Sequence, residues 1–222
     1  MLPSISMKNP IRTRVKICGI TSIEDAKNVC NYGADAIGLV FYEKSPRNVE
    51  IKQAQEICAN IPPFITSVGL FLDASEEFVN SVLASVPLDL LQFHGSETPE
   101  YCASFNRPYM KAVGMKGMGS EADFAKYADQ YPDSKAFLVD SHGKGKAGGT
   151  GETFDWNDVP QNYNKPIILA GGLNPDNVAN ALAQIELYGI DLSSGVESQP
   201  GKKDKQKIMQ LMEEVKRVQC KK

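Results

Sequence analysis

Eight short apolar runs, rich in β-branched residues, alternate along this 222-residue chain with longer segments that carry apolar residues at helical spacing. The runs begin near Val15, Ala36, Ile65, Leu88, Tyr109, Ala136, Pro166 and Gly189. Successive runs start about 25 residues apart, which is enough for one strand, one helix and two short loops. The pattern therefore predicts eight strand–helix units.

Eight such units can form either a closed (β/α)8 barrel or an open doubly wound sheet. The closed barrel is favoured because eight units close it, because roughly 200 to 250 residues suffice for it, and because no proline-rich linker divides the chain. Residues 68–72 and 167–170 are apolar throughout, as is typical of strands buried on both faces. The predicted fold class is α/β, with a single TIM barrel of eight parallel strands.

The predicted barrel occupies residues 15–222, and residues 1–14 are predicted to form a flexible N-terminal extension. The sixth helix is expected to be short or irregular. A glycine- and lysine-rich segment, residues 141–152, follows the sixth run and leaves only residues 156–159 for a helical turn before the seventh. The chain is thus expected to be one domain with one weak helical unit.

Several of the predicted helices carry start signals. Thr21 with Glu24 fits a capping box, in which the two side chains bond the first backbone N–H groups. Thr98 and Asn174 each precede a proline, which fits an N-cap followed by proline at the first helical position. The basic residues from Lys202 to the end are expected on the solvated face and frayed end of the last helix.

The composition argues against several classes of protein. With 42% hydrophobic residues and a net charge of -3, the chain is too apolar and too weakly charged to be disordered. No apolar stretch approaches the roughly 20 residues that span a bilayer. Nucleic-acid binding rests on a clustered excess of Lys and Arg, which an acidic chain lacks. Neither a membrane nor a nucleic acid is expected as a partner.

The cysteines indicate a reducing compartment. There are five of them, an odd number, scattered without a C-x-x-C pair, and only two histidines could join them in a metal site. Neither a disulfide scaffold nor a bound metal is therefore expected. Residues 1–14 lack the apolar segment and the cleavage site of a signal peptide. We expect a cytoplasmic protein.

Two reactive side chains stand at predicted strand ends, where barrel active sites are built. Cys18 ends the first run just before a helix start, whose partial positive charge can lower the thiol pKa and supply a thiolate. Asp140 ends the sixth run, where a carboxyl group can bind a hydroxyl or donate a proton. The other four cysteines lie on helical segments or in the tail, so only Cys18 is a catalytic candidate.

The last two strand ends carry a predicted phosphate site. Gly171 and Gly172 follow the seventh run, and Ser193, Ser194 and Gly195 follow the eighth. Backbone N–H groups in such loops can approach an oxyanion closely, and many barrels bind phosphate in these two loops. A thiolate base and a carboxylic acid across the same barrel mouth outline a proton-transfer isomerase that acts on a sugar phosphate.

Seven motifs in register resemble the phosphoribosylanthranilate isomerase family, from Val15 to Val218. Glycine-rich phosphate loops occur in many barrels, so one motif alone is weak and the set is specific. In the fourth motif Phe93 replaces an aliphatic residue common in the family, and we expect it to adjust only packing. The motifs are residues 16–21, 38–41 with 45–47, 92–95, 138–141, 148–151, 169–173 and 191–197.

The resemblance implies a specific reaction, the Amadori rearrangement of N-(5-phosphoribosyl)anthranilate to 1-(2-carboxyphenylamino)-1-deoxy-D-ribulose 5-phosphate in L-tryptophan biosynthesis. It implies no cofactor. By the family's mechanism, Asp140 would protonate the ring oxygen of the ribose and open the ring to a Schiff base. Cys18 would take the proton from C2′, giving an enolamine that tautomerises to the ketone.

The resemblance also implies how the phosphorylated substrate is bound. Arg47 would face the anthranilate carboxylate, for which a guanidinium fork is suited. His94 and Asp191 would line the pocket in supporting roles. The phosphate would be held by the loops after the seventh and eighth strands, with Gly171, Gly172, Ser193, Ser194 and Gly195.

Two other functions are weighed against this one. A metal-dependent pentose-phosphate epimerase would need several histidine and aspartate ligands at the strand ends, which two histidines do not provide. A non-catalytic or differently specific sugar-phosphate-binding barrel would make Cys18 and Asp140 incidental. The sequence is compatible with both a monomer and a homodimer.

Overall fold

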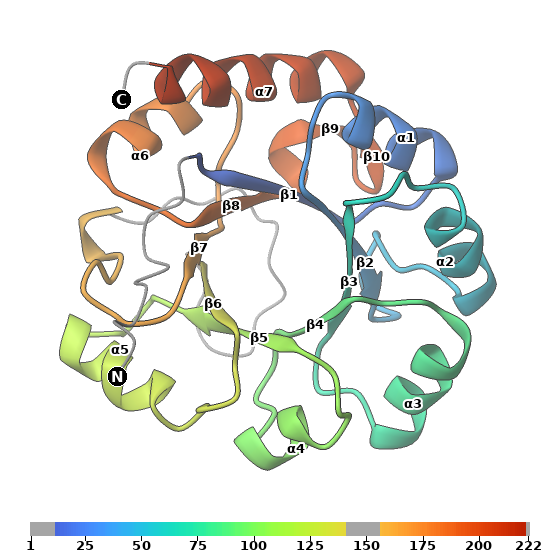
Figure 1. Ribbon diagram of the computed structural model, residues 1–222, viewed down its shortest axis with the longest axis horizontal. Helices are drawn as coiled ribbons and strands as arrows, with labels where there is room; N and C mark the ends of the chain where they lie inside the picture. The colour runs from blue at the N-terminus through green and yellow to red at the C-terminus, as the bar shows by residue number, and fades with distance from the viewer. Residues whose placement is uncertain (1–11, 141–155, 221–222) are drawn as a thin grey trace, which may run out of the picture.

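The strands of the computed structural model, which describes residues 12–140 and 156–220, form one closed parallel barrel in the order β1 to β8 (Figure 1). Each of the eight apolar runs contributes one strand, so the closed barrel is confirmed over the open sheet. The strands are β1 Arg14–Cys18, β2 Ala36–Phe41, β3 Thr66–Phe71, β4 Leu90–Phe93, β5 Tyr109–Gly114, β6 Ala136–Asp140, β7 Ile167–Leu169 and β8 Gly189–Leu192.

Helices surround this barrel as an outer ring (Figure 1). In the described part of the segment between β6 and β7, the helical structure is a single 3-10 turn, Trp156–Asp158, as expected for a short or irregular sixth helix. None of the helices in the described ranges is long and apolar enough to cross a membrane. The α-helices are α1 Ile23–Asn31, α2 Ile51–Cys58, α3 Glu76–Ser85, α4 Pro99–Ala103, α5 Glu121–Ala128, α6 Val178–Gln184 and α7 Lys205–Gln219.

The capping predictions are confirmed in one case and corrected in two. Thr98 caps α4 by accepting from the N–H of Tyr101. Ser22, not Thr21, caps α1, because the Thr21 hydroxyl donates instead to a carbonyl oxygen from far along the chain, that of Gly201. Asn174 caps only the turn before α6, which itself begins at Val178.

The described chain enters the barrel earlier than the sequence pattern suggests. Strand β1 begins at Arg14, inside the segment assigned to an extension, and Arg12 forms an ion pair with Asp35. The rest of the predicted extension, residues 1–11, lies outside the described residues. The glycine-rich motif at 148–151 lies outside them as well.

The main core lies between the strands and the helices and includes a row of aromatic rings. Phe41 and Phe71 stack with their centroids 5.3 Å apart. Phe93 continues the row, and its ring centroid lies 5.8 Å from that of Phe105 and 5.8 Å from that of Tyr109. Phe93 is fully buried and belongs to this core.

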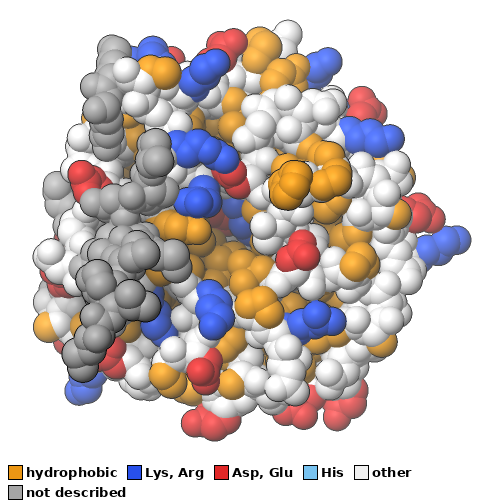
Figure 2. Space-filling view, in the orientation of Figure 1, with side chains coloured by type: hydrophobic (Ala, Val, Ile, Leu, Met, Phe, Trp, Pro, Cys, Tyr) orange, Lys and Arg blue, Asp and Glu red, His pale blue; other side chains and the backbone are white. Residues whose placement is uncertain are grey.

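A pocket also lies at the amino-terminal end of the strands, on the face that Figure 2 shows, where hydrophobic side chains gather around a central hollow. It is lined by the first residues of several strands, among them Arg14 and Gly189. Phe64 lies beside this pocket with its side chain fully exposed. This face is opposite to the end where the strands carry their reactive residues.

At the carboxyl-terminal end of the strands, a buried ion pair between Lys111 and Glu97 connects two loops to the barrel. Lys111 of β5 is fully buried, and its Nζ lies 2.8 Å from Oε2 of Glu97. Glu97 also accepts hydrogen bonds from the backbone N–H groups of Asp73 and Gly95, at 2.9 Å each. Because Asp73 follows β3 and Gly95 follows β4, the pair ties both loops to β5.

We expect Lys111→Met to lower the free energy of unfolding by about 3 to 5 kcal/mol, because it leaves the Glu97 carboxylate buried and unpaired. Urea denaturation measures this change. The control is Arg217→Ala, which removes an exposed ion pair with Glu214 and should leave the midpoint unchanged. Equal midpoints for the two variants would contradict a role for the buried pair in holding the loops.

Candidate active site at the carboxyl-terminal mouth of the barrel

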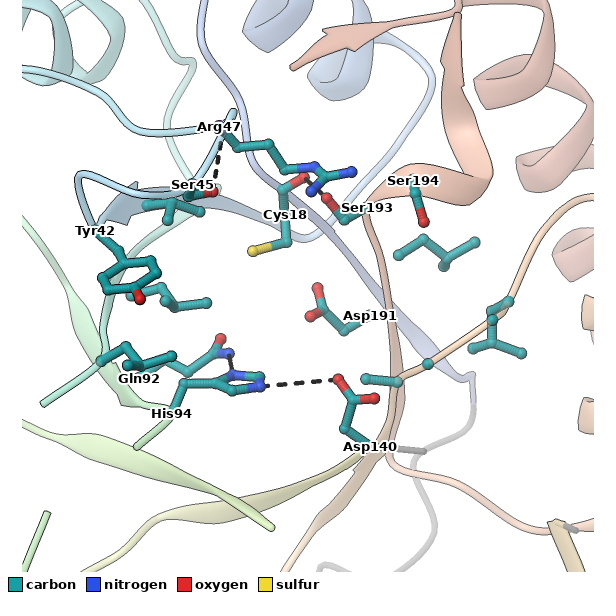
Figure 3. Close-up of a pocket in the computed structure, with 18 residues that line it drawn as sticks. Cys18, Tyr42, Ser45, Arg47, Gln92, His94, Asp140, Asp191, Ser193 and Ser194 are labelled. Carbon is teal, nitrogen blue, oxygen red and sulfur yellow. Dashed lines mark hydrogen bonds and ion pairs between the residues drawn. The ribbon is translucent and has the colours of Figure 1, made fainter. Parts of the chain in front are cut away.

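A pocket lies at the carboxyl-terminal ends of the strands and collects nearly all of the predicted site residues (Figure 3). Gly195 is the exception; it packs against the backbone of Leu173, which lines the pocket. The remaining lining is mostly apolar and comes from β2, β3, β4, β8 and the loops after β2, β3 and β7. The predicted residues that line it are Cys18, Arg47, His94, Asp140, Gly171, Gly172, Asp191, Ser193 and Ser194.

Cys18 and Asp140 face each other across this pocket. Cys18 is the last residue of β1 and Asp140 the last of β6, and both side chains are buried. Figure 3 shows the Cys18 sulfur directed into the pocket from one side and the Asp140 carboxyl group at the other. A small molecule between them would meet a thiol and a carboxyl group on different sides.

The Cys18 pKa differs from the sequence prediction. Burial raises the pKa of the Cys18 thiol, and the positive charge of Lys16 lowers it without overcoming that effect. The predicted lowering of this pKa is wrong, because burial outweighs the nearby positive charges and α1 begins only at Ile23, five residues beyond Cys18. A buried lysine two residues earlier in β1 acts instead.

Lys16 is a site residue that the sequence interpretation missed. Its Nζ lies 2.9 Å from Oδ1 of Asp191, and both side chains are buried. A Cβ added to Gly38 of β2 would lie 2.7 Å from Cys18 Sγ and 3.1 Å from Lys16 Nζ, so the thiol and the ammonium are neighbours. The period of two in a strand gives the missing signal, since residues 16 and 18 point to the same side.

His94 lies beside Asp140 and is neutral at pH 7. Its Nε2 is 3.8 Å from Asp140 Oδ2, and burial lowers the pKa of the imidazole although the Asp140 charge opposes this. The Gln92 amide nitrogen lies 2.9 Å from His94 Nδ1. The other ring nitrogen, Nε2, is directed toward the Asp140 carboxyl group.

Arg47 is less available than predicted. Its Nε and Nη2 each donate to the Glu197 carboxylate at 2.8 Å, so one edge of the guanidinium fork is occupied. Lys203 also lies 2.8 Å from Glu197. Burial raises the pKa of the Glu197 carboxyl group, but Arg47 and Lys203 outweigh this and hold it below its usual range. Two cations and one carboxylate leave this side of the pocket positively charged.

Lys203 corrects the expectation for the basic tail. A short hairpin, β9 Glu197–Gln199 and β10 Lys202–Lys203, follows β8 and turns the Lys203 side chain inward. The side chain is buried, and its Nζ also donates to the Ser193 carbonyl oxygen at 3.2 Å. Only the later basic residues fit the solvated face of α7. Lys203 was missed because its partner lies in a hairpin that the pattern did not predict.

The loops after β7 and β8 have the geometry of an anion site. Gly171 and Gly172 have φ values of +85° and +65°, and their N–H groups donate to no other described residue. A Cβ on Gly195 would lie 1.9 Å from the Leu173 carbonyl oxygen, so the two loops pack backbone against backbone. Glycine is therefore required here, and Gly195 supports the site from behind. Ser194 lines the pocket beside these glycines.

No group of three or more His, Cys, Asp or Glu side chains in residues 12–140 and 156–220 is placed to hold a metal ion. The described pocket holds side-chain acids and bases, with the loops after β7 and β8 beside them.

Comparison with known proteins shows which family the chain resembles. The family model described as N-(5'phosphoribosyl)anthranilate (PRA) isomerase matches residues 15–214. The N-(5'-phosphoribosyl)anthranilate isomerase of Cellvibrio japonicus is 55% identical over 194 residues, which are 87% of this chain and 89% of that protein.

Two solved structures have the same fold. One shows monomers generated from the dimeric phosphoribosylanthranilate isomerase of Thermotoga maritima, at a TM-score of 0.78 and 35% identity, covering 92% of this chain and 98% of that one. The other is a phosphoribosyl anthranilate isomerase in complex with reduced 1-(o-carboxyphenylamino)-1-deoxyribulose 5-phosphate, at a TM-score of 0.78 and 36% identity, with the same coverage.

The lowered pKa of His94 predicts a pH-dependent stability. Below its ordinary pKa of about 6.5, the unfolded chain binds a proton at His94 that the folded chain resists, so folding weakens as the pH falls. We expect the wild type to lose stability relative to His94→Asn between pH 8 and pH 5. Urea denaturation across this range measures the difference, and parallel curves for the two proteins would contradict a buried neutral imidazole.

Proposed function

The chain belongs to the N-(5'-phosphoribosyl)anthranilate isomerase family and catalyses the isomerisation of phosphoribosylanthranilate in tryptophan biosynthesis, and we propose that Cys18 and Asp140 transfer its two protons. This membership sets aside the non-catalytic barrel and the epimerase. The observation that carries the assignment is the placement of the two groups across one pocket.

The reaction needs an acid and a base at different atoms of one sugar. Asp140 gives a proton to the ring oxygen, the bond from C1′ to that oxygen breaks, and a Schiff base forms with the anthranilate nitrogen. Cys18, as the thiolate, takes the proton from C2′ and leaves an enolamine. Protonation at C1′ and loss of the hydroxyl proton then give the ketone. The His94 ring, whose Nε2 lies 3.8 Å from Asp140 Oδ2, supports the orientation of that carboxyl group.

The pocket has two sides that suit the two ends of the substrate. Side chains from β2 and the end of β3, among them Val40 and Leu70, give an apolar wall for the anthranilate ring. Arg47 binds the anthranilate carboxylate through the N–H groups that Glu197 leaves open. The glycine-rich loops after β7 and β8 hold the phosphate, and Cys18 and Asp140 lie between these ends.

The proposed phosphate ligands are the backbone N–H groups of these two loops together with the serine hydroxyls. Gly171 and Gly172 present N–H groups without another described partner. Ser194 lines the pocket, while the Ser193 hydroxyl donates to the Cys18 carbonyl oxygen at 3.1 Å and connects the loop after β8 to the end of β1.

The described pocket brings the proposed acid, base and anion loops together within one chain, and we propose that a monomer suffices for activity. A homodimer, the state of the Thermotoga maritima relative, would leave the site intact if a second copy covered Phe64 at the opposite end of the barrel. We propose a cytoplasmic enzyme, since all five cysteines are free thiols, as is typical of a reducing compartment. We also propose a small phosphorylated substrate and no nucleic-acid or membrane partner.

We expect wild-type protein to abolish the fluorescence of freshly made phosphoribosylanthranilate, and Cys18→Ser and Asp140→Asn each to slow this by a factor of about 10² to 10⁴. The matched control is Cys58→Ser, on the helix α2 away from the pocket, which should turn over substrate like the wild type. Wild-type rates in either active-site variant would contradict the assigned roles.

A further inference from the structure

Lys16 is placed where it can act on the active site without touching substrate. It lies in β1 two residues before Cys18, and its side chain is buried inside the barrel. It is not among the residues that line the pocket, whereas Cys18 and Asp191 are. Lys16 therefore acts on the pocket mainly through these two neighbours, to which it is adjacent, and its charge also lowers the pKa of His94.

The ammonium group lies between the thiol and the carboxylate. Lys16 and Asp191 are register partners where β1 pairs with β8, and their Nζ and Oδ1 atoms are 2.9 Å apart. On the other side of β1, the hydrogens of Gly38 leave the space in which Lys16 Nζ approaches Cys18 Sγ. Larger residues at position 38 would push into both atoms.

Lys16 is charged at every working pH. Burial alone would lower the pKa of its ammonium group, but Asp191 and Cys18 outweigh that effect and hold the pKa above its ordinary value. A buried thiolate needs such a fixed counter-charge, because burial disfavours the charged form of the thiol. Without one, the fraction of Cys18 present as thiolate at neutral pH would be smaller still, and the thiol would accept the C2′ proton more slowly.

Other charges also face Cys18, and they differ in sign. Lys203 of β10 lowers the pKa of the thiol, while the Asp191 carboxylate of β8 raises it. Asp140 and His94 lie across the pocket. Asp191 thus has two opposite effects: it holds Lys16 in place, and it neutralises part of the charge that Cys18 experiences.

We propose that Lys16 is a positioning residue that supplies the counter-charge of the Cys18 thiolate, and that Asp191 sets how much of that charge reaches the sulfur. The proposal deepens the role of Cys18 as the base and rests on it. It predicts that removing Lys16 and removing Asp191 change the acidity of the thiol in opposite directions, which two merely structural residues would not do.

The test measures how the alkylation rate of Cys18 by iodoacetamide depends on pH, with Cys18 followed by mass spectrometry of its peptide. We expect Lys16→Met to raise the midpoint of this curve by one pH unit or more, and Asp191→Asn to lower it. The control is Lys165→Met. Lys165 lies just before β7 and donates to the backbone carbonyl oxygens of Tyr131 and Pro132, so its removal should leave the midpoint unchanged.

Activity gives the second measurement. The pH midpoint of kcat/KM should move with the alkylation midpoint in each variant. Lys16→Met should lower kcat at pH 7 about tenfold for each pH unit by which the midpoint rises, because the thiolate fraction falls by that factor. KM should hardly change, because Lys16 does not contact substrate. Lys16→Arg keeps the charge and should restore the midpoint.

The alkylation and activity measurements distinguish a failure of the Lys16 counter-charge from a failure of Cys18 as the base. Equal alkylation midpoints in all variants, or changes of the same sign for Lys16→Met and Asp191→Asn, would overturn it. If Lys16→Met does not fold, a midpoint that fails to fall in Asp191→Asn overturns it as well. Opposite changes in the alkylation midpoints without any change in the kcat/KM profile would support the counter-charge and instead contradict Cys18 as the base.

Discussion

The parallel pairing of β1 with β8 is the constraint on which the active site depends. These strands come from opposite ends of the barrel sequence, and their pairing places Lys16 against Asp191. The same closure brings Ser193 to the carbonyl oxygen of Cys18. Because an open sheet would leave β1 and β8 at separate edges, the base, its charged neighbours and the phosphate loops meet only when the barrel closes.

Buried charge is concentrated around that mouth. Lys16 pairs with Asp191, Lys111 pairs with Glu97, and Glu197 takes both Arg47 and Lys203. Buried ion pairs add little net stability compared with apolar packing, but they are costly to break. Their position indicates that they shape the site: one pair holds the loops beside His94, and the others set the charge beside Cys18 and the anion loops.

The sequence predicted what local patterns determine, namely the eight strands and the polar residues at their ends. Cys18 and Asp140 could be placed in one pocket because strand ends of a barrel converge. Lys16 and Lys203 were not predicted as site residues, because lysines are usually solvated and their carboxylate partners lie in other strands. The direction of the Cys18 pKa depends on burial, which a local helix signal cannot give.

The most direct test of two-sided proton transfer is a crystal structure of this chain with reduced 1-(o-carboxyphenylamino)-1-deoxyribulose 5-phosphate, the compound present in one related structure. We predict the phosphate against Gly172 and Ser194, and C2′ within about 3.5 Å of Cys18 Sγ, with the Asp140 carboxyl group on the other side of the sugar. A complex with the sugar turned away from Cys18, or with both groups on one side of it, would contradict the mechanism.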